Sequence, residues 1–359
     1  MNSVKRLFNL ASLATRAKPA VGTTPSDVVF AENKWRLLRY RGAPKHARPI
    51  LMVPSLINRH YVLDLLPGKS FAEWMVAQGW DVYCIDWGTP GPEDRWVTFD
   101  DVCDVALGRA IRRAAKTSGA DQVHLLGYCL GGTLTTIHAA VHHERIASMC
   151  ALAAPVRFDS PGLLEAWTRT PTFDVRAIVN ATGNVPWQLM QSAFHMLRPT
   201  LTLSKAVHMI DRAWDDEFLD GFLAIETWGN DNVSFPGECY VRYIEELYRG
   251  DALRKGTFTL GGRAARLEDV TCPLLVVSFE NDNIVPKEAA TALIDLAGSK
   301  VKKHVHLPGG HVGAVVSRSA SKRLWPALDE FFAAHDRRER VSGRQGVRRS
   351  GGQDDGPPA

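Results

Sequence analysis

The chain has 359 residues, 45% of them apolar and 23% charged, and its 43 basic and 39 acidic residues leave a net charge of +4. This composition is that of a globular protein, not a disordered or fibrous one, and the near balance of charge argues against a nucleic-acid partner. Six scattered cysteines without a C-x-x-C pair favour a reducing, cytoplasmic compartment, and no apolar stretch approaches the roughly 18 residues of a transmembrane segment.

The first element along the chain is an N-terminal segment, residues 1–30, in which we expect an amphipathic helix. Two basic residues precede a mildly apolar run, and no acid occurs before Asp27. A cleaved secretion signal is disfavoured because Arg16 closely follows that run.

Residues 31–156 alternate strand-like runs with helix-period segments, which predicts an α/β fold with a mostly parallel central sheet and helices on both faces. The predicted helices "SFAEWMVAQG" and "DVCDVALGRAIRRAAKTSG" both end in glycine, as helix C-termini often do. The predicted strands cover residues 35–40, 48–56, 80–87, 122–128 and 146–156.

The alternation stops after residue 156 and resumes at residue 272. Residues 157–271 contain helical pieces such as "VPWQLMQSAFHMLRP" and "DEFLDGFLAIETWGNDN", and we expect them to form a cap, or lid, inserted between two strands of one sheet. Residues 272–335 return to a strand–helix–strand–helix pattern and form the second part of the core. The polar residues 336–359 are predicted to be a disordered tail.

The motif Gly127-Tyr128-Cys129-Leu130-Gly131 fits G-x-S-x-G with sulfur in place of oxygen, and it stands between a predicted strand and a predicted helix. In such a nucleophile elbow, glycines two positions before and after the nucleophile are needed because side chains there would collide with neighbouring backbone. The alternative is a buried structural cysteine, which leaves the paired glycines unexplained. We therefore predict that Cys129 is a nucleophile.

A thiol nucleophile needs a base, and the base needs an orienting acid. Asp282 follows a resumed strand and His311 follows the next strand, on the turn "PGGH", so the chain order is nucleophile, acid, histidine. We predict a catalytic triad of Cys129, Asp282 and His311. Glu280 and Asp231 remain alternative acids.

Other histidines receive less weight. His304 and His306 alternate along a short strand and are expected to pack or to face solvent. His138 and His142 stand four apart on one helix, as in some metal sites, but without a third ligand a solvated helix face is favoured, and no metal is predicted.

The oxyanion formed during acyl transfer needs backbone N–H donors. In this type of elbow one donor is the residue after the nucleophile, Leu130, and the other lies in the loop after an early strand. In "VPSLINRHY" that second donor is Leu56 or Ile57. The Pro/Gly-rich loop "DWGTPGPEDR" is expected at the same sheet edge, where Asp86 and Arg95 either line the entrance or form a structural ion pair or turn cap.

Together these stretches resemble the polyhydroxyalkanoate synthases, and most closely the short catalytic subunits that work with a second subunit. The similarity covers most of residues 25–332 and leaves out the N-terminal segment and the tail. Carried over by position, the family's nucleophile, aspartate and histidine fall on Cys129, Asp282 and His311. The matching stretches include "VPSLINRHYVLDLLPGKSF", "DVYCIDWGTPGPEDR", "LLGYCLGGTL", "GNVPWQLMQSAF", "ETWGNDNVSFPGECY", "DNIVP" and "PGGHVGAVVS".

The resemblance implies an α/β-hydrolase fold and a poly(3-hydroxyalkanoate) synthase that polymerises (R)-3-hydroxyacyl-CoA, with 3-hydroxybutyryl-CoA as the expected monomer. Acyl-CoA is then a substrate, and no cofactor is expected. An accessory subunit or a homodimer, and the surface of a polyester granule in the cytoplasm, are the expected partners. Two rival functions remain: a cysteine-dependent hydrolase or simple acyltransferase on the same fold, and a non-catalytic granule-binding scaffold.

Overall fold

The computed structural model describes residues 2–160, 162–197 and 201–336. The predicted tail therefore lies outside the described residues, apart from its first residue. Asp336 accepts hydrogen bonds from the backbone N–H groups of Ala47 and Arg48, at 2.7 and 2.9 Å, and is anchored to the core.

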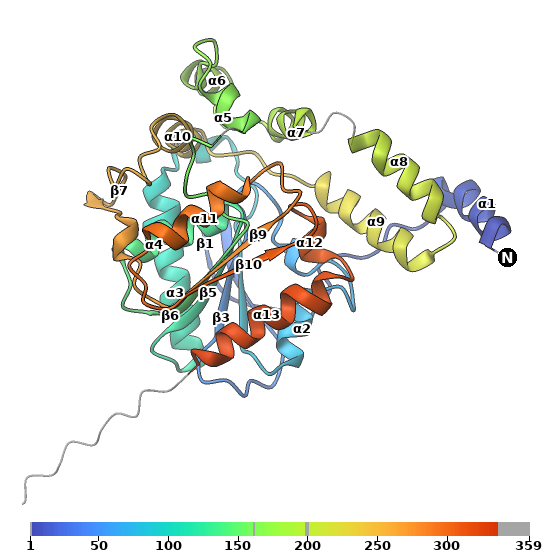
Figure 1. Cartoon of the computed structure of the whole chain (residues 1–359), viewed down its shortest axis with the longest axis horizontal. Helices are drawn as coiled ribbons and strands as arrows, with labels where there is room; N and C mark the ends of the chain where they lie inside the picture. The colour runs from blue at the N-terminus through green and yellow to red at the C-terminus, as the bar shows by residue number, and fades with distance from the viewer. Residues whose placement is uncertain (1, 161, 198–200, 337–359) are drawn as a thin grey trace, which may run out of the picture.

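An eight-stranded sheet forms the centre of the molecule (Figure 1). Its strand order is β1-β2-β4-β3-β5-β6-β9-β10; β2 is antiparallel to both β1 and β4, and the six strands from β4 to β10 run parallel. The predicted fold class, a mostly parallel sheet with flanking helices, is confirmed. The strands are β1 (Ser26–Glu32), β2 (Trp35–Tyr40), β3 (Ile50–Val53), β4 (Val82–Asp86), β5 (Val123–Tyr128), β6 (Ile146–Leu152), β9 (Leu274–Phe279) and β10 (Lys302–Leu307).

Helices cover both faces of the sheet because side chains alternate between the faces along each strand. On β3, Leu51 and Val53 pack with one buried cluster, which also contains residues of α3, α4 and α11. Ile50 and Met52 face the opposite cluster, with α2, α12 and α13. The helices of the core are α2 (Phe71–Ala77), α3 (Leu107–Ser118), α4 (Leu130–Val141), α11 (Lys287–Leu296), α12 (Gly313–Val316) and α13 (Ala320–Ala334).

Several short helices lie in the loops of the core. A π-helical turn leads directly into α3, which ends at Gly119 with a φ of 74°. That left-handed conformation is why glycine follows the helix. These short elements are η2 (His60–Leu63), η3 (Pro92–Trp96) and the π-helical η4 (Asp101–Ala106).

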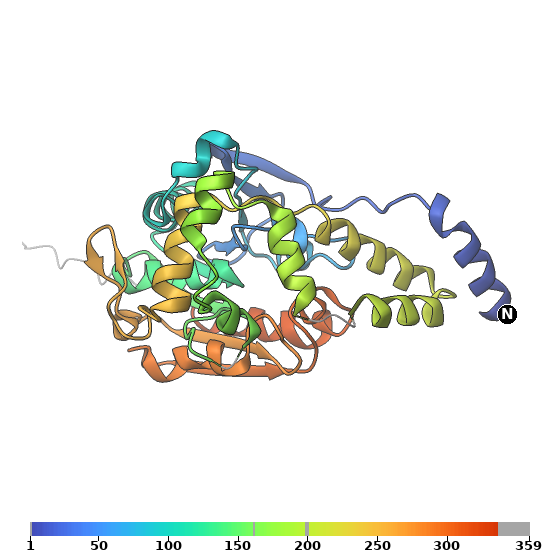
Figure 2. The same cartoon turned by 90° about the horizontal axis from the view of Figure 1, so that it is seen from above.

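The chain between β6 and β9 contains mainly helices, joined by loops and one short hairpin (Figures 1 and 2). α5, α6, α7 and α10 lie over the body of the molecule. The elements of this region are α5 (Leu163–Thr168), α6 (Val175–Thr182), α7 (Trp187–Met196), α8 (Leu201–Arg212), α9 (Asp216–Gly229), α10 (Gly237–Arg242), the π-helical η5 (Tyr243–Arg249), the hairpin β7 (Thr259–Leu260) and β8 (Arg263–Ala264), and η6 (Leu267–Asp269).

The N-terminal segment forms helix α1 (Asn2–Ser12) and a short turn, η1 (Leu13–Thr15), and α1 packs beside α8 and α9. These three helices project from the body as an arm (Figure 2). Polar contacts fasten α1 there: the Asn9 amide donates to the Ala213 carbonyl at 2.7 Å, and Arg16 pairs with Asp220 at 2.8 Å. No helix among the described residues has the length and apolar character needed to cross a bilayer.

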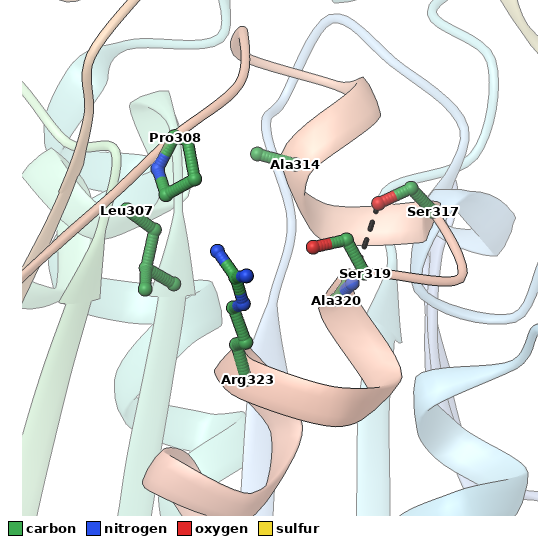
Figure 3. A pocket seen from close by; sticks show the side chains of 7 residues that line it. All are labelled: Leu307, Pro308, Ala314, Ser317, Ser319, Ala320 and Arg323. Atoms are coloured by element: carbon green, nitrogen blue, oxygen red, sulfur yellow. Dashed lines mark hydrogen bonds between the residues drawn. The ribbon is translucent and has the colours of Figure 1, made fainter.

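A small pocket opens between the end of β10 and the turn from α12 to α13 (Figure 3). Leu307, Pro308 and Arg323 line it, and its volume is about 10 Å³. That is room for about one water molecule. The pocket is therefore too small to hold a substrate.

Candidate active site

Cys129 occupies the sharp turn between β5 and α4. Its backbone has φ 56° and ψ −130°, a left-handed conformation that costs free energy for any residue except glycine. A hydrogen bond holds the turn on the sheet: the Cys129 N–H donates to the Leu152 carbonyl, at the end of β6, at 2.9 Å. Of the six cysteines, Cys129 alone is partly exposed, and burial raises the pKa of the other five.

The glycines around the thiol have a steric cause. A Cβ atom on Gly131 would lie 2.0 Å from the carbonyl oxygen of Val53, and one on Gly127 would lie 2.3 Å from the Thr135 hydroxyl and 2.4 Å from the Gly132 Cα. Neither contact is possible without moving the backbone. The glycine pattern thus reports how closely β3, β5 and α4 approach one another.

Asp282 and His311 meet in the loops that follow β9 and β10. The Nδ1 atom of His311 lies 2.7 Å from an Asp282 carboxylate oxygen, and both side chains are buried. The other Asp282 oxygen accepts hydrogen bonds from the backbone N–H groups of Ile284 and Val285, each at 2.9 Å. The carboxylate therefore has fixed partners on both sides and holds the imidazole in one orientation.

The second ring nitrogen of His311, Nε2, is not used in the contact with Asp282. Nε2 is buried and has no hydrogen-bond partner of good geometry among the described residues. Burial alone would lower the pKa of His311. The charges of Asp282 and Cys129, together with the hydrogen bond to Asp282, raise that pKa well above its usual value. The imidazole is thus electrostatically coupled to the thiol as well as to the carboxylate.

Tyr128, the residue before the nucleophile, also positions the histidine. Its ring stacks on the His311 ring with centroids 5.3 Å apart, and its hydroxyl donates to the His311 backbone carbonyl at 3.2 Å. In the sequence, its place inside the elbow motif is the only signal that marks it.

The predicted oxyanion donors lie around the same turn. Leu130 is the first residue of α4, whose N-terminal N–H groups and dipole favour negative charge. The backbone N–H groups of Leu56 and Ile57 donate to no backbone carbonyl among the described residues. The close approach of Gly131 to the end of β3 brings this loop against the start of α4.

The alternative acids have other surroundings. Asp231 pairs with Arg59 at 3.0 Å and accepts a hydrogen bond from the Tyr61 hydroxyl at 2.7 Å, whereas Glu280 is exposed. His304 and His306 each lie 2.9 Å from the Ser278 hydroxyl. Asp282 is the carboxylate that contacts His311.

Asp86 and Arg95 were expected either to line the entrance of the site or to form an ion pair or turn cap. Asp86 is buried and pairs with Arg36 at 2.5 Å and with His60 at 3.4 Å. It also accepts the Gly88 N–H at 3.1 Å, which makes it an ion-pair partner and a turn cap. Arg95 lies over the exposed ring of Trp96, 4.7 Å from its centroid, at the C-terminal edge of the sheet.

Two tyrosines of the helical region between β6 and β9 contact each other and interact electrostatically with Cys129. Tyr243 and Tyr248 of η5 stack edge to face, 5.2 Å between centroids. Burial raises the pKa of each phenol, and the proximity of Cys129 adds to the rise. The helical region between β6 and β9 therefore contributes side chains to the surroundings of Cys129, a contribution that the sequence alone did not locate.

The prediction that His138 and His142 lie on a solvent-exposed face of their helix is wrong for His138. This histidine is buried, and burial lowers its pKa to about 4. Asp104 of η4 supplies the carboxylate that sequence reasoning lacked, at 2.6 Å from His142. This cluster lies at the far end of α4 from Cys129.

Comparison with known proteins identifies the fold class of the chain. A family model described as the alpha/beta hydrolase fold matches residues 48–316. Among solved structures, an esterase from Thermogutta terrifontis (TM-score 0.51, 17% identity, 90% of this chain and 99% of that one) and a monoacylglycerol lipase from Paleococcus ferrophilus (TM-score 0.51, 16% identity, 83% and 99%) share the fold. The chain has the α/β-hydrolase fold, with cysteine at the nucleophile position.

A second family model, the N-terminus of poly-beta-hydroxybutyrate polymerase (PhaC), matches residues 15–75. The poly(3-hydroxyalkanoate) polymerase subunit PhaC of Allochromatium vinosum is 34% identical over 317 residues, covering 87% of this chain and 89% of that protein. The corresponding subunit from Haloferax mediterranei is 34% identical over 323 residues, covering 89% and 66%. The chain belongs to the poly(3-hydroxyalkanoate) polymerase family of acyltransferases, and the expected family is confirmed.

Proposed function

We propose that this chain is the catalytic subunit of a poly(3-hydroxyalkanoate) synthase that extends polyester through a covalent thioester on Cys129. One observation carries the proposal: a strained thiol at the start of α4 interacts electrostatically with a histidine that is held by a buried carboxylate. The family relationship supplies the substrate class, (R)-3-hydroxyacyl-CoA, with 3-hydroxybutyryl-CoA as the expected monomer.

In the loading step, His311 takes the proton of the Cys129 thiol and the thiolate attacks the carbonyl carbon of the acyl-CoA thioester. The bond between that carbon and the CoA sulfur breaks, and CoA leaves with the proton from His311. One thioester replaces another, so the exchange costs little free energy. Leu130 and either Leu56 or Ile57 donate backbone N–H groups to the transient oxyanion.

In the extension step, His311 accepts the proton of the 3-hydroxyl group on an incoming or chain-end acyl unit. The hydroxyl oxygen attacks the Cys129 thioester, an ester bond forms, and the bond to the Cys129 sulfur breaks. The proton on His311 returns to the thiolate. Asp282 keeps Nδ1–H of the imidazole directed toward itself, so that Nε2 faces the reacting atoms in both steps.

Water competes with the hydroxyl for the same thioester, so a polymerase must exclude it. We assign that task to the helical region between β6 and β9, treated as a lid. Tyr243 and Tyr248 support this role because both phenols lie in the surroundings of the thiol. Trp228 packs the region onto the core, donating from Nε1 to the Arg59 carbonyl at 2.9 Å.

We also propose that the helical arm meets the accessory subunit or the surface of a polyester granule in the cytoplasm. Val4, Leu7 and Phe8 on α1 are 69–74% exposed, and Val207 and Ile210 on α8 are exposed as well. Burying such side chains against an apolar surface is favourable. Cosedimentation with polyester granules should weaken for the Leu7→Ser, Phe8→Ser double variant, whereas Val301→Ser, at an exposed site outside the arm, should leave it unchanged.

One assay separates the proposed activity from its rival. Incubation with 3-hydroxybutyryl-CoA should release CoA and form insoluble polyester. Release of CoA with free 3-hydroxybutyrate as the sole product would instead identify a hydrolase. A scaffold that keeps the fold without catalysis would release no CoA in this assay, with or without an accessory subunit.

A further inference from the structure

We propose that Asp104, His138 and His142 form a binding site for a divalent transition-metal ion such as Zn²⁺. One ligand atom from each of the three residues lies within 4.8 Å of the other two. Two imidazole nitrogens and one carboxylate oxygen are a donor set that such ions prefer. The site is separate from the catalytic thiol: nine residues of helix separate Cys129 from His138, about 14 Å at 1.5 Å per residue.

His138 is already oriented as metal-bound histidines are. Its Nδ1 lies 2.8 Å from the backbone carbonyl of Cys103, an acceptor, so Nδ1 carries the proton and donates. Nε2 is then the nitrogen with a free lone pair. A histidine that donates one N–H to a carbonyl and offers the other nitrogen to an ion is the usual arrangement at metal sites.

His142 contacts two groups of opposite charge. Its Nε2 is 2.6 Å from an Asp104 carboxylate oxygen, and Arg263 Nη2 lies 2.6 Å from the same nitrogen and 3.2 Å from Nδ1. A neutral ring protonated on Nε2 donates to the carboxylate and accepts from the guanidinium at Nδ1. A metal ion in place of the guanidinium gives both the Nε2 lone pair and the carboxylate a favourable partner.

The surroundings leave room for the ion and for the movement that binding requires. A pocket of about 270 Å³ lies beside the cluster and is lined by His138, His142 and Glu144, among others. The His138 and His142 rings are stacked with centroids 4.7 Å apart, so His142 must turn to direct its lone pair at a shared ion. His142 and Asp104 are partly exposed, and the donor atoms must close in by roughly 1–2 Å to reach bonding distances near 2 Å.

Arg263 occupies the position next to His142 Nε2 that a bound metal ion would take. It is exposed and lies on the two-residue strand β8, after a turn in which Gly261 and Gly262 both have positive φ. Its guanidinium competes with a cation for His142, so removing it should strengthen metal binding. If the three residues had only a structural role, removing Arg263 would not increase the affinity for a metal ion.

The test uses full-length, tag-free, metal-stripped protein carrying Cys129→Ala, so that the catalytic thiol cannot bind the ion. Zn²⁺ is titrated calorimetrically, and Co²⁺ is followed through its visible absorption bands. We expect one equivalent to bind. His142→Ala and Asp104→Asn should each weaken binding at least tenfold, whereas Arg263→Ala should tighten it severalfold.

His304→Ala is the matched control, because His304 and His306 form a histidine pair without a carboxylate ligand, and it should leave the affinity unchanged. Circular dichroism of each variant verifies that it has folded. The proposal is overturned if no saturable binding occurs, or if one equivalent binds with an affinity that Asp104→Asn, His142→Ala and Arg263→Ala do not alter. The measurement detects binding alone, so its outcome is independent of the polymerase activity.

Discussion

The two ends of helix α4 differ in how tightly they are constrained. At its start, Cys129 is strained, backbone carbonyls crowd Gly131, and the loops after β9 and β10 supply Asp282 and His311. At its far end, His142 contacts the partly exposed Asp104 of η4 and the exposed Arg263 of β8. The proposed chemistry lies at the end where parallel strands terminate, because their loops converge there on fixed backbone positions. The other end has side chains that can rearrange.

The largest expected effect is at the constrained end. Cys129→Ala should lower CoA release from 3-hydroxybutyryl-CoA by on the order of 10³-fold or more, because no group remains to form the thioester. Steady-state CoA release measures it. Cys272→Ala removes a buried thiol before β9 and should keep most of the activity. Similar rates of CoA release for Cys129→Ala and the parent chain would contradict catalysis through Cys129.

Replacing the orienting acid should have the next largest effect. Asp282→Asn keeps the side-chain shape but weakens the hold on the Nδ1 proton of His311, and a loss of roughly 10²- to 10⁴-fold in rate is expected. Asp231→Asn changes the alternative acid, which contacts Arg59 and Tyr61, and is the control. If Asp231→Asn were the more damaging of the two, the acid would have to be reassigned.

Gly131 at the start of α4 and Gly108, which lies against His138 near the far end of α4, compare the tolerance of the two ends. Gly131→Ala forces a Cβ to 2.0 Å from the Val53 carbonyl oxygen and should cost about 2–3 kcal/mol of unfolding free energy. Gly108→Ala, on α3, brings a Cβ only to 3.2 Å from the His138 ring and the Arg112 side chain. Its helical propensity gain of about 1 kcal/mol offsets that contact. Urea unfolding measures both, and equal losses would contradict the contrast.

The smallest expected effect is on the pH dependence of stability. The folded-state pKa of His311 is raised, so its contribution is complete below the unfolded-state pKa, about 6.5, and is lost as the pH rises through the folded-state pKa. The difference in unfolding free energy between the parent chain and His311→Gln should therefore shrink from mildly acidic to alkaline pH. A difference that instead grows with pH would show that the pKa is lowered.

The sequence predicted the sheet, the turn at Cys129 and the placing of Asp282 and His311 in loops after β9 and β10, because these rest on local signals: apolar alternation, glycines at fixed offsets, and loops after strands. It missed β1, an edge strand whose partly exposed side chains give no clear alternation. It also missed the third member of the histidine cluster. Asp104 lies 34 positions before His138 and reaches it through a π-helical turn that no local pattern reveals.

The most direct test of the account is to incubate the protein with 3-hydroxybutyryl-CoA, quench it during turnover, and examine its peptides by mass spectrometry. We predict that the peptide "HLLGYCLGGTL" gains the mass of one or more hydroxybutyryl units on its single thiol. Polyester formation with that thiol unmodified, or with the acyl group on another residue, would contradict the central claim.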